Sequence, residues 1–456
     1  MESVTFDFRG TENLWTLSKG EAWIGGSGTP GWIKGDVMYW PKRQTFSGLC
    51  TSALDFQELV PVLPPTVERT VRLFQFEGEP PHVRMEFEGH RADRDALRLQ
   101  GKFSGTNFVY NGALFDTAEL GVVVSEQVIQ LEEFNAEMAS GNVQGNVTLD
   151  LVDRHVDFDI VSRANPHQVR VVVGSRILTS ILLPFEFDGP LFLAAHGSIY
   201  GGDPLRSKLH LTLDARRMAY TPWWADEVSL TLDWENGTVE ISALDVAMYD
   251  GSLSGDIAFH LPRPGVKEPL KYDLRLGVKD VEFEDVIRTL SQEKGKPYEG
   301  SLGGTIELAG EVGSGVGENL QGGGEIEIFD GRIMEIPLFG GLSVILTNLY
   351  SGLGVTKQTA FQADFTVEGV DLHLENVEVE GAVYSLKADG SYAIDTKTLD
   401  FDVEFQLLRD GVVGSVVRLI TKPVTKLLEF DLGGTLLRPK WRPKTLPEEL
   451  WGDFWQ

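Results

Sequence analysis

The residues best able to do chemistry in this chain are closely spaced carboxylates. Asp157 and Asp159 lie two positions apart, and Asp400, Asp402 and Glu404 repeat that spacing. Two carboxylates can act as general acid and base when one of them is desolvated. Residues two apart on a strand share one face, however. The same acidic spacing recurs along the chain, so a solvated acidic face is the favoured interpretation.

Other catalytic or ligand-binding patterns are weak. The eight histidines include no short-spaced ligand pair, and a single cysteine excludes a disulfide framework or a thiolate zinc site. The run Gly26-Ser27-Gly28-Thr29-Pro30-Gly31 matches the dinucleotide-binding letters, but that chemistry needs a helix N-terminus immediately afterwards. Residues 32–37 are typical of a strand instead. We therefore expect no enzyme, no cofactor and no metal site.

Charge and composition exclude further classes. The 456 residues include 68 Asp plus Glu against 40 Lys plus Arg, a formal net charge of −28. A nucleic-acid-binding protein needs a cationic surface, so we expect no nucleic acid partner. Hydrophobic residues make up 42% of the chain, enough for a sizeable core. The 50 glycines follow no collagen period and indicate turns and bulges in a β-rich protein.

Alternating apolar and polar residues predict the strands that position these carboxylates. From Leu399 to Leu407 every odd position is apolar and every even position is polar, and residues 361–368 follow the same rule. This period is typical of antiparallel strands with one wet face. We expect these apolar side chains to share one face and to line any groove that the sheet forms. Its predicted lining residues are Val156, Phe158, Ile160, Phe361, Phe365, Val367, Leu399, Phe401, Val403 and Phe405.

Turn signals and an internal repeat support a meander of hairpins. Asn111-Gly112 and Asn236-Gly237 supply the positive φ that tight hairpins require. An ungapped offset of 110 residues predicts a structural repeat, with a looser third copy from Leu374 to Gly390. The offset aligns Leu131, Phe134, Met138, Gly141 and Gly145 with Ile241, Leu244, Met248, Gly251 and Gly255.

Four helices are expected among the strands. Two are short, at residues 54–63 and 281–290. A third lies in the uncharged stretch 336–356, which is nearly long enough to span a membrane but is interrupted by polar residues and glycines. A helix buried against the sheet is favoured here over a helix in a membrane interface. If the helix contacts a membrane, its contact residues are Leu338, Leu342, Ile345 and Leu349.

The fourth predicted helix, residues 413–430, carries a basic stripe opposite an aliphatic one. Arg418, Lys422 and Lys426 are spaced i, i+4, i+8 in an otherwise acidic chain. Such a stripe could hold the helix on an anionic membrane surface, or could pair with the protein's own acidic sheet. Pro423 is expected to kink or divide the helix.

An ordered set of C-terminal motifs resembles the C-terminal region of AsmA-like proteins of bacterial envelopes, which are relatives of TamB. The resemblance is best over residues 320–445. Its motifs are Asp330-Gly331-Arg332-Ile333, Leu338-Phe339-Gly340-Gly341-Leu342-Ser343, the strand 361–369, Gly381, Asp389-Gly390-Ser391-Tyr392-Ala393-Ile394-Asp395, Leu399-Asp400-Phe401, Gly433-Gly434-Thr435-Leu436 and Pro439-Lys440-Trp441.

The resemblance implies a mainly β fold, a long twisted antiparallel groove-shaped sheet with a few short helices and two amphipathic helices near the C-terminus. It divides the chain into an N-terminal β region (1–110), a repeated β-groove region (111–320) and an AsmA-like C-terminal region (321–456). It also implies a periplasmic protein associated with the inner membrane that carries phospholipid or another acyl lipid toward the outer membrane. The family usually begins with a transmembrane helix, and residues 1–20 contain no apolar run of that kind.

Two other functions fit the same patterns. The apolar face could pack on envelope protein partners, which would make the chain a structural or outer-membrane assembly scaffold. Alternatively, tryptophans gathered on one surface could stack on carbohydrate. That hypothesis would use Trp23, Trp32, Trp40, Trp223 and Trp224. A charge placed inside the apolar face should remove lipid from a conduit, which separates the first function from the scaffold.

Overall fold

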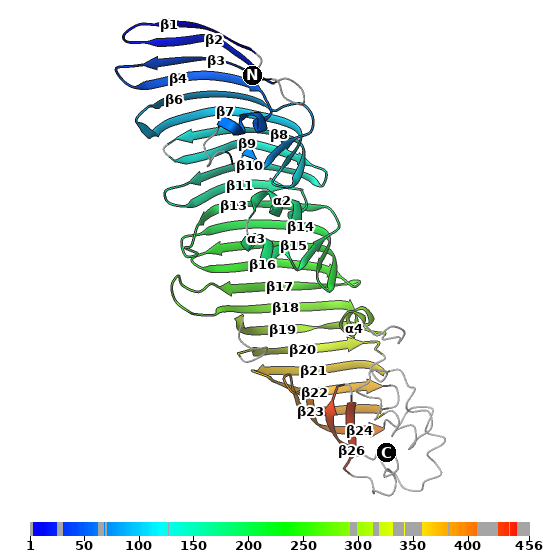
Figure 1. Ribbon diagram of the computed structural model, residues 1–456. Helices are drawn as coiled ribbons and strands as arrows, with labels where there is room; N and C mark the ends of the chain where they lie inside the picture. Colours follow the sequence, from blue (N-terminus) through cyan, green and yellow to red (C-terminus); the bar gives the residue numbers. More distant parts are fainter. Residues whose placement is uncertain are drawn as a thin grey trace, which may run out of the picture. The chain divides into compact units, whose positions relative to one another are not determined.

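Over the residues that the structure describes, the protein is mainly β, and the strands belong to one open antiparallel sheet of 26 strands (Figure 1). This confirms the fold class expected from the alternating sequence. The contacts within the chain divide into an N-terminal unit, Met1–Thr221 with Thr231–Gly237, and a C-terminal unit, Pro222–Leu230 with Thr238–Gln456. The computed structural model describes residues 3–24, 31–62, 68, 71–125, 127–174, 176–291, 299–312, 319–331, 342, 358–381, 384–407, 427–436 and 438–444.

Strands of the N-terminal unit pair in chain order, with two short exceptions. Its strands are β1 (Ser3–Gly10), β2 (Trp15–Ile24), β3 (Gly31–Trp40), β4 (Thr45–Ala53), β5 (Phe74–Phe76), β6 (His82–His90), β7 (Asp93–Tyr110), β8 (Ala113–Ser125), β9 (Val128–Met138), β10 (Gly141–Asp150), β11 (His155–Ser162), β12 (Phe185–Phe187), β13 (Leu191–Tyr200) and β14 (Lys208–Tyr220). β4 pairs with β6 and β11 with β13, while the short β5 and β12 pair with β7 and β14.

The C-terminal unit is an uninterrupted meander, in which each strand from β16 to β26 pairs with the next. β15 (Trp223–Glu235) contributes to both units. The remaining strands are β16 (Thr238–Met248), β17 (Gly251–His260), β18 (Leu270–Glu282), β19 (Ser301–Val312), β20 (Gln321–Phe329), β21 (Gln358–Glu368), β22 (Asp371–Gly381), β23 (Tyr384–Ala393), β24 (Thr398–Leu407), β25 (Leu427–Thr435) and β26 (Arg438–Pro443).

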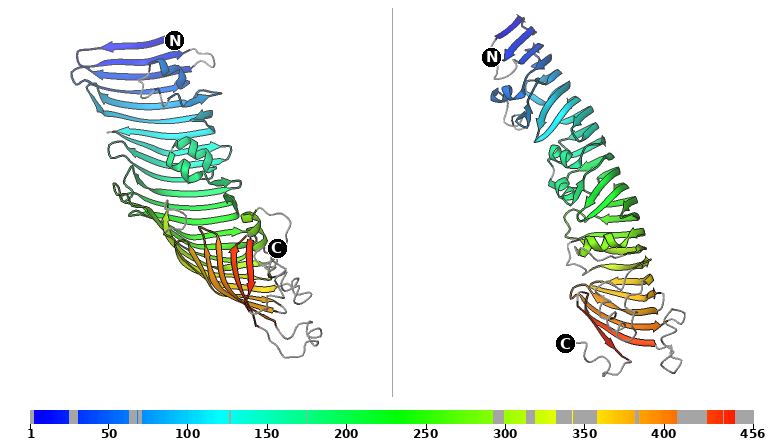
Figure 2. Two further views of the ribbon diagram at one scale, coloured as in Figure 1. Left: turned by 60° about the horizontal axis from the view of Figure 1, so that its bottom comes forward. Right: turned by 90° about the vertical axis from the view of Figure 1, so that its right-hand side faces the viewer.

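Helical segments occur where the chain passes between paired strands. The 3-10 helix η1 (Phe56–Val62) follows β4, the helices α2 (Pro166–Val173) and α3 (Arg176–Leu182) follow β11, and α4 (Phe283–Ser291) follows β18. Within the N-terminal unit, η1, α2 and α3 lie on the same side of the strands (Figure 2). Among the described residues, no helix has the length and hydropathy needed to cross a bilayer.

The predicted helices are partly confirmed. η1 and α4 occupy the positions expected at 54–63 and 281–290. The stretches expected as longer helices fall mostly outside the described residues. Residues 427–430 were expected to end the second of them, but they open β25 instead. There Leu428 and Phe430 pair with Phe405 and Val403, so the alternating pattern of a strand prevails over the helical one.

Strand register confirms the internal repeat at the 110-residue offset. The β9–β10 and β16–β17 hairpins pair equivalent positions: Met138 with Gly141, Phe134 with Gly145, Met248 with Gly251, and Leu244 with Gly255. Both registers then shift at a β-bulge before the next apolar pair, which is Leu131 with Val147 and Ile241 with Ile257. The repeat is therefore a bulged hairpin.

The bulge of the third copy is built in the same way as the first. Glu133 has a φ of 47°, and its N–H donates to Asn146 Oδ1 at 2.8 Å. Asn376 has a φ of 52°, and its N–H donates to Asp389 Oδ1 at 3.0 Å. A short polar side chain on the neighbouring strand thus satisfies the N–H that the bulge removes from the ladder.

The two contact-based units and the three regions expected from the sequence divide the chain at different places. The expected boundary between residues 110 and 111 falls in the turn of the β7–β8 hairpin, whose strands pair from Tyr110 to Arg98. The two units separate instead between residues 221 and 238, inside the expected central region.

Candidate functional site

Register places apolar residues in continuous rows across the N-terminal unit. Each row runs perpendicular to the strands, and its members lie side by side on one face. One row joins Phe8, Leu17, Val37, Gly48, Phe87, Leu99, Val124, Ile129, Leu149, Val156 and Ile199. The next joins Gly20, Gly35, Cys50, Met85, Gly101, Val122, Leu131, Val147, Phe158, Gly197 and Leu209. We call these rows the N-terminal lane, which contains no charged residue.

The C-terminal unit has an equivalent C-terminal lane, which runs from β16 to β26. Its first row joins Leu244, Gly255, Leu276, Ile306, Gly324, Phe365, Leu374, Gly390, Phe401, Leu432 and Trp441. Its second joins Ile241, Ile257, Leu274, Leu308, Gly322, Val367, Leu372, Tyr392, Leu399, Gly434 and Pro439. This lane is also without charge.

Much of the N-terminal lane is only half-buried. Phe87, Leu99, Val124, Leu149 and Val156 all retain partial exposure. One buried cluster lies where α2 packs on the sheet. That cluster is Phe108, Ala113, Phe115, Ala118, Met138 and Ala164, with Val169, Val171 and Val172 of α2 packed against it. The lane away from the helices is therefore an apolar surface that the described part of the chain does not cover.

The C-terminal lane changes from open to packed along its length. Its members on β16–β19, such as Leu276 and Ile306, are half-buried. From β20 onward many residues of the same face join a buried core that includes Phe405, Phe430 and Trp441. In this part of the unit the apolar face packs against the protein itself.

The opposite face of the sheet is charged and hydrated. Its exposed pairs include Glu21 with Lys34 at 3.1 Å and His210 with Asp233 at 2.7 Å. Lys444 lies between Asp402 and Asp431, and these ion pairs lower the pKa of Asp402 and raise the pKa of Lys444. Exposed pairs add little stability individually. Their main effect is to keep this face in water and direct apolar contacts to the other one.

All ten residues predicted to line a groove lie on the apolar faces of their strands, but their exposure differs. Val156, Phe158, Ile160, Phe361, Phe365 and Phe401 are half-buried. The other four, Val367, Leu399, Val403 and Phe405, are buried. The half-buried residues have surface available for a ligand, whereas the buried ones already pack in the protein.

Of the residues proposed to contact a membrane, only Leu342 falls within the described structure. It is fully buried in the C-terminal core. This burial fits the prediction of a helix packed against the sheet. Leu342 itself has no exposed surface for membrane contact, so its assignment as a membrane-contact residue was wrong. The others lie outside the described residues: Leu338, Ile345, Leu349, Arg418, Lys422 and Lys426.

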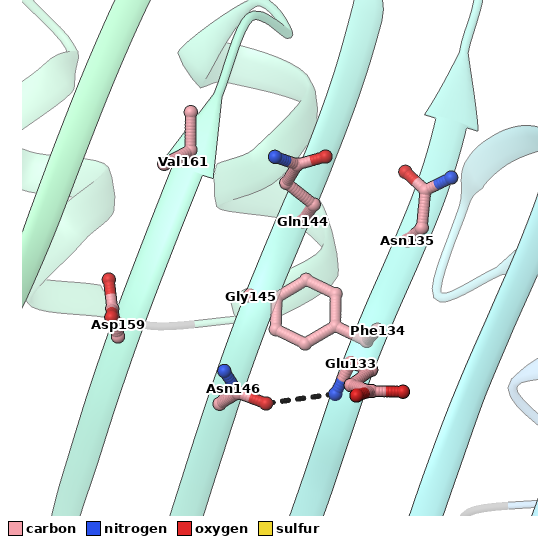
Figure 3. Close-up of a pocket in the computed structure, with 8 residues that line it drawn as sticks. All are labelled: Glu133, Phe134, Asn135, Gln144, Gly145, Asn146, Asp159 and Val161. Carbon is pink, nitrogen blue, oxygen red and sulfur yellow. Dashed lines mark hydrogen bonds between the residues drawn. The ribbon is translucent and has the colours of Figure 1, made fainter.

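The polar residues considered for catalysis do not assemble into a recognisable centre within the described chain. Asp159 borders a shallow hollow of about 430 Å³ at the first bulge, together with Glu133, Asn135, Gln144 and Asn146 (Figure 3). Asp157 lies on the same strand, hydrogen-bonded to Ser198. No group of His, Cys, Asp or Glu in the described ranges has the arrangement of a metal site.

The sequence did not predict α2 and α3, which cover the margin of the N-terminal lane. Four valines in α2 favour a strand by propensity. The available signals were its ends: Asn165 accepts a hydrogen bond from the N–H of His167, Pro166 opens the helix, and Gly174 closes it at a φ of 64°. Asn111 Nδ2 also donates to the carbonyl of Val171 at 2.7 Å, which ties α2 to the β7–β8 turn.

Comparisons of this chain with protein-family models, with curated proteins and with solved structures find no match.

Proposed function

We propose that the N-terminal lane and the open β16–β19 part of the C-terminal lane bind the acyl chains of lipids, and that the protein is a non-enzymatic lipid-binding and lipid-transfer protein. The observation that carries this proposal is the uncharged lane of the N-terminal unit, uninterrupted from β1 to β14 and only half-buried. Soluble proteins rarely leave contiguous apolar surface of this kind without a ligand or partner.

Acyl chains suit this surface in both chemistry and geometry. Each methylene that leaves water for an apolar surface contributes about 0.8 kcal/mol at full burial. Neighbouring strands are about 4.8 Å apart, so side chains along a row form a nearly continuous apolar path. Because no specific polar group is needed along that path, an acyl chain can move from one strand to the next without breaking a hydrogen bond.

The cellular setting of the proposal comes from the resemblance to AsmA-like proteins. On that basis the chain acts in the periplasm beside the inner membrane and carries phospholipid toward the outer membrane. The structure supports only the underlying requirement, a sheet with one apolar and one charged face.

A pair of adjacent valines gives a matched test of acyl binding. Val124 lies in the N-terminal lane between Leu99 and Ile129, whereas Val123 lies between Gln100 and Gln130 on the charged face. We expect native mass spectrometry to detect co-purified lipid on the wild-type protein and on Val123→Glu. We expect Val124→Glu to lose most of it, since a carboxylate in the lane must be desolvated beside the lipid.

Two results would contradict acyl binding in the lane. One is wild-type protein free of lipid even after incubation with phospholipid vesicles. The other is equal lipid content in Val123→Glu and Val124→Glu, with both variants folded by circular dichroism. Loss of a co-purified protein from Val124→Glu, without any lipid on the wild type, would instead support the scaffold function.

A further inference from the structure

The segment around α2 and α3 differs in charge from the rest of this acidic chain. No Asp or Glu occurs between residues 160 and 185, although the whole chain carries 68 of them. The same interval contains Arg163, Arg170 and Arg176. No ion pair within the described structure joins Arg163 or Arg170 to a carboxylate, and the Arg163 guanidinium lies 5.2 Å from the centre of the Phe192 ring.

One side of this segment is fixed to the sheet. Val169, Val171 and Val172 pack against the buried cluster of Phe108 and Phe115. The cap at Asn165 and the hydrogen bond from Asn111 to α2 hold the helix in place. α2 is therefore anchored to the N-terminal unit, and other side chains are displayed on it and on α3.

The displayed side chains are aliphatic. Val173 is 59% exposed, Ile181 is 57% exposed and Leu183 is 72% exposed, all within α2, α3 and the residue that follows them. Val173 is the last residue of α2, Ile181 lies in α3 and Leu183 directly follows α3. Exposed aliphatic groups concentrated on a rigid support mark an interaction surface.

The chemistry of the surface favours a lipid bilayer over a protein. Between residues 160 and 184 the segment has no Phe, Tyr, Trp or Met, the residues that typically anchor protein interfaces. A second copy of this chain carries a net charge of −28 and would be repelled. Aliphatic groups beside Arg170, which has no carboxylate partner among the described residues, match the boundary between acyl chains and anionic headgroups.

We propose that the α2–α3 segment docks the protein on an anionic bilayer surface. Val173, Ile181 and Leu183 enter the interface, and Arg170, one helical turn before Val173, lies beside headgroup phosphates. Docking does not depend on acyl chains in the lanes. It places the helix-covered margin of the N-terminal lane against the bilayer, which gives lipids a point of entry.

Vesicle flotation tests the docking directly. The full chain is incubated with vesicles of phosphatidylcholine alone, or of phosphatidylcholine mixed with phosphatidylglycerol. We expect the wild type to float with the mixed vesicles, and less so at high salt, because headgroup attraction is screened. The double variant Ile181→Glu, Leu183→Glu should bind the mixed vesicles more weakly by about tenfold or more, and Arg170→Glu should weaken binding in the same direction.

A matched control lies at the turn between β10 and β11. Leu151 and Val152 are exposed by 55% and 68%, and the double variant Leu151→Glu, Val152→Glu adds the same charge outside the segment. It should float like the wild type. Circular dichroism melting checks that each variant is folded.

Three results would overturn the docking proposal: no flotation of the wild type with phosphatidylglycerol, equal flotation of the Ile181→Glu, Leu183→Glu variant and the wild type, or equal loss in the control. Membrane binding that survives the α2–α3 substitutions belongs to another surface. A failure of this kind leaves acyl binding by the lanes intact, because lipid content is measured separately.

Discussion

At the scale of single residues, Lys444 shows how the charged face is organised. Its ammonium contacts Asp402 on β24 and lies 2.9 Å from Asp431 on β25. It therefore offsets the repulsion of two carboxylates on adjacent strands. The hydrogen bond from Lys444 lowers the pKa of Asp402, and the hydrogen bonds to Asp402 and Asp431 raise the pKa of Lys444.

These shifts predict a pH dependence with a definite sign. A lowered pKa of Asp402 contributes stability above its unfolded value, near 3.9, which is lost as the pH falls through the folded value. The variant Lys444→Met should raise the pKa of Asp402 and move acid unfolding of the C-terminal unit to higher pH. NMR titration of the Asp402 carboxyl carbon measures the first effect. An unchanged pKa of Asp402 would mean that the ion pair does not form in solution.

At the scale of elements, the alternating pattern predicted the strands well because each has one wet face. It also located the repeat, since the bulged hairpins need glycine at fixed positions. It failed where two periodicities compete. Residues 427–430 fit a helix in isolation but pair with Phe405 and Val403 in β24. The valines of α2 favour a strand, yet their caps and the packing on Phe108 produce a helix.

The repeat glycines predict a sharp difference between two substitutions. Gly255 has a φ of 152°, and a Cβ at this position would lie 1.9 Å from the carbonyl oxygen of Arg275 on β18. Gly255→Ala should therefore destabilise the β16–β18 region by roughly 2–4 kcal/mol. In Gly78→Ala the new Cβ meets nothing within 4 Å, so this variant is the control. Hydrogen–deuterium exchange of residues 251–282 should speed up only in Gly255→Ala; equal protection in both variants would refute the strained geometry.

At the scale of the whole molecule, the sequence predicted two faces but not which parts of the apolar face stay open. Phe158 and Phe405 have the same alternating surroundings in the sequence. Register and packing separate them, because Phe405 joins the buried core of the C-terminal unit while Phe158 remains half-buried. Burial of this kind depends on residues distant in the chain, such as Trp441, so no local pattern reports it.

The single cysteine offers a direct measurement on the open lane. Cys50 lies in the N-terminal lane between Gly35 and Met85, half-buried, and burial raises the pKa of its thiol. Its alkylation should therefore be slow at neutral pH and accelerate at higher pH, since the thiolate is the reacting form. Bound acyl chains should slow it further and shift the emission of a polarity-sensitive fluorophore attached at Cys50 to shorter wavelength.

Occupancy by lipid should link the Cys50 signal to the rest of the N-terminal lane. The lipid-dependent shift at Cys50 should decrease in Val124→Glu, although Val124 lies on β8 in the neighbouring row, because an acyl chain that spans several strands requires an uninterrupted apolar lane. Val123→Glu should leave the shift unchanged. If lipid alters the fluorophore equally in both variants, acyl chains bind near Cys50 as isolated molecules, and the N-terminal lane is a set of separate sites rather than a path.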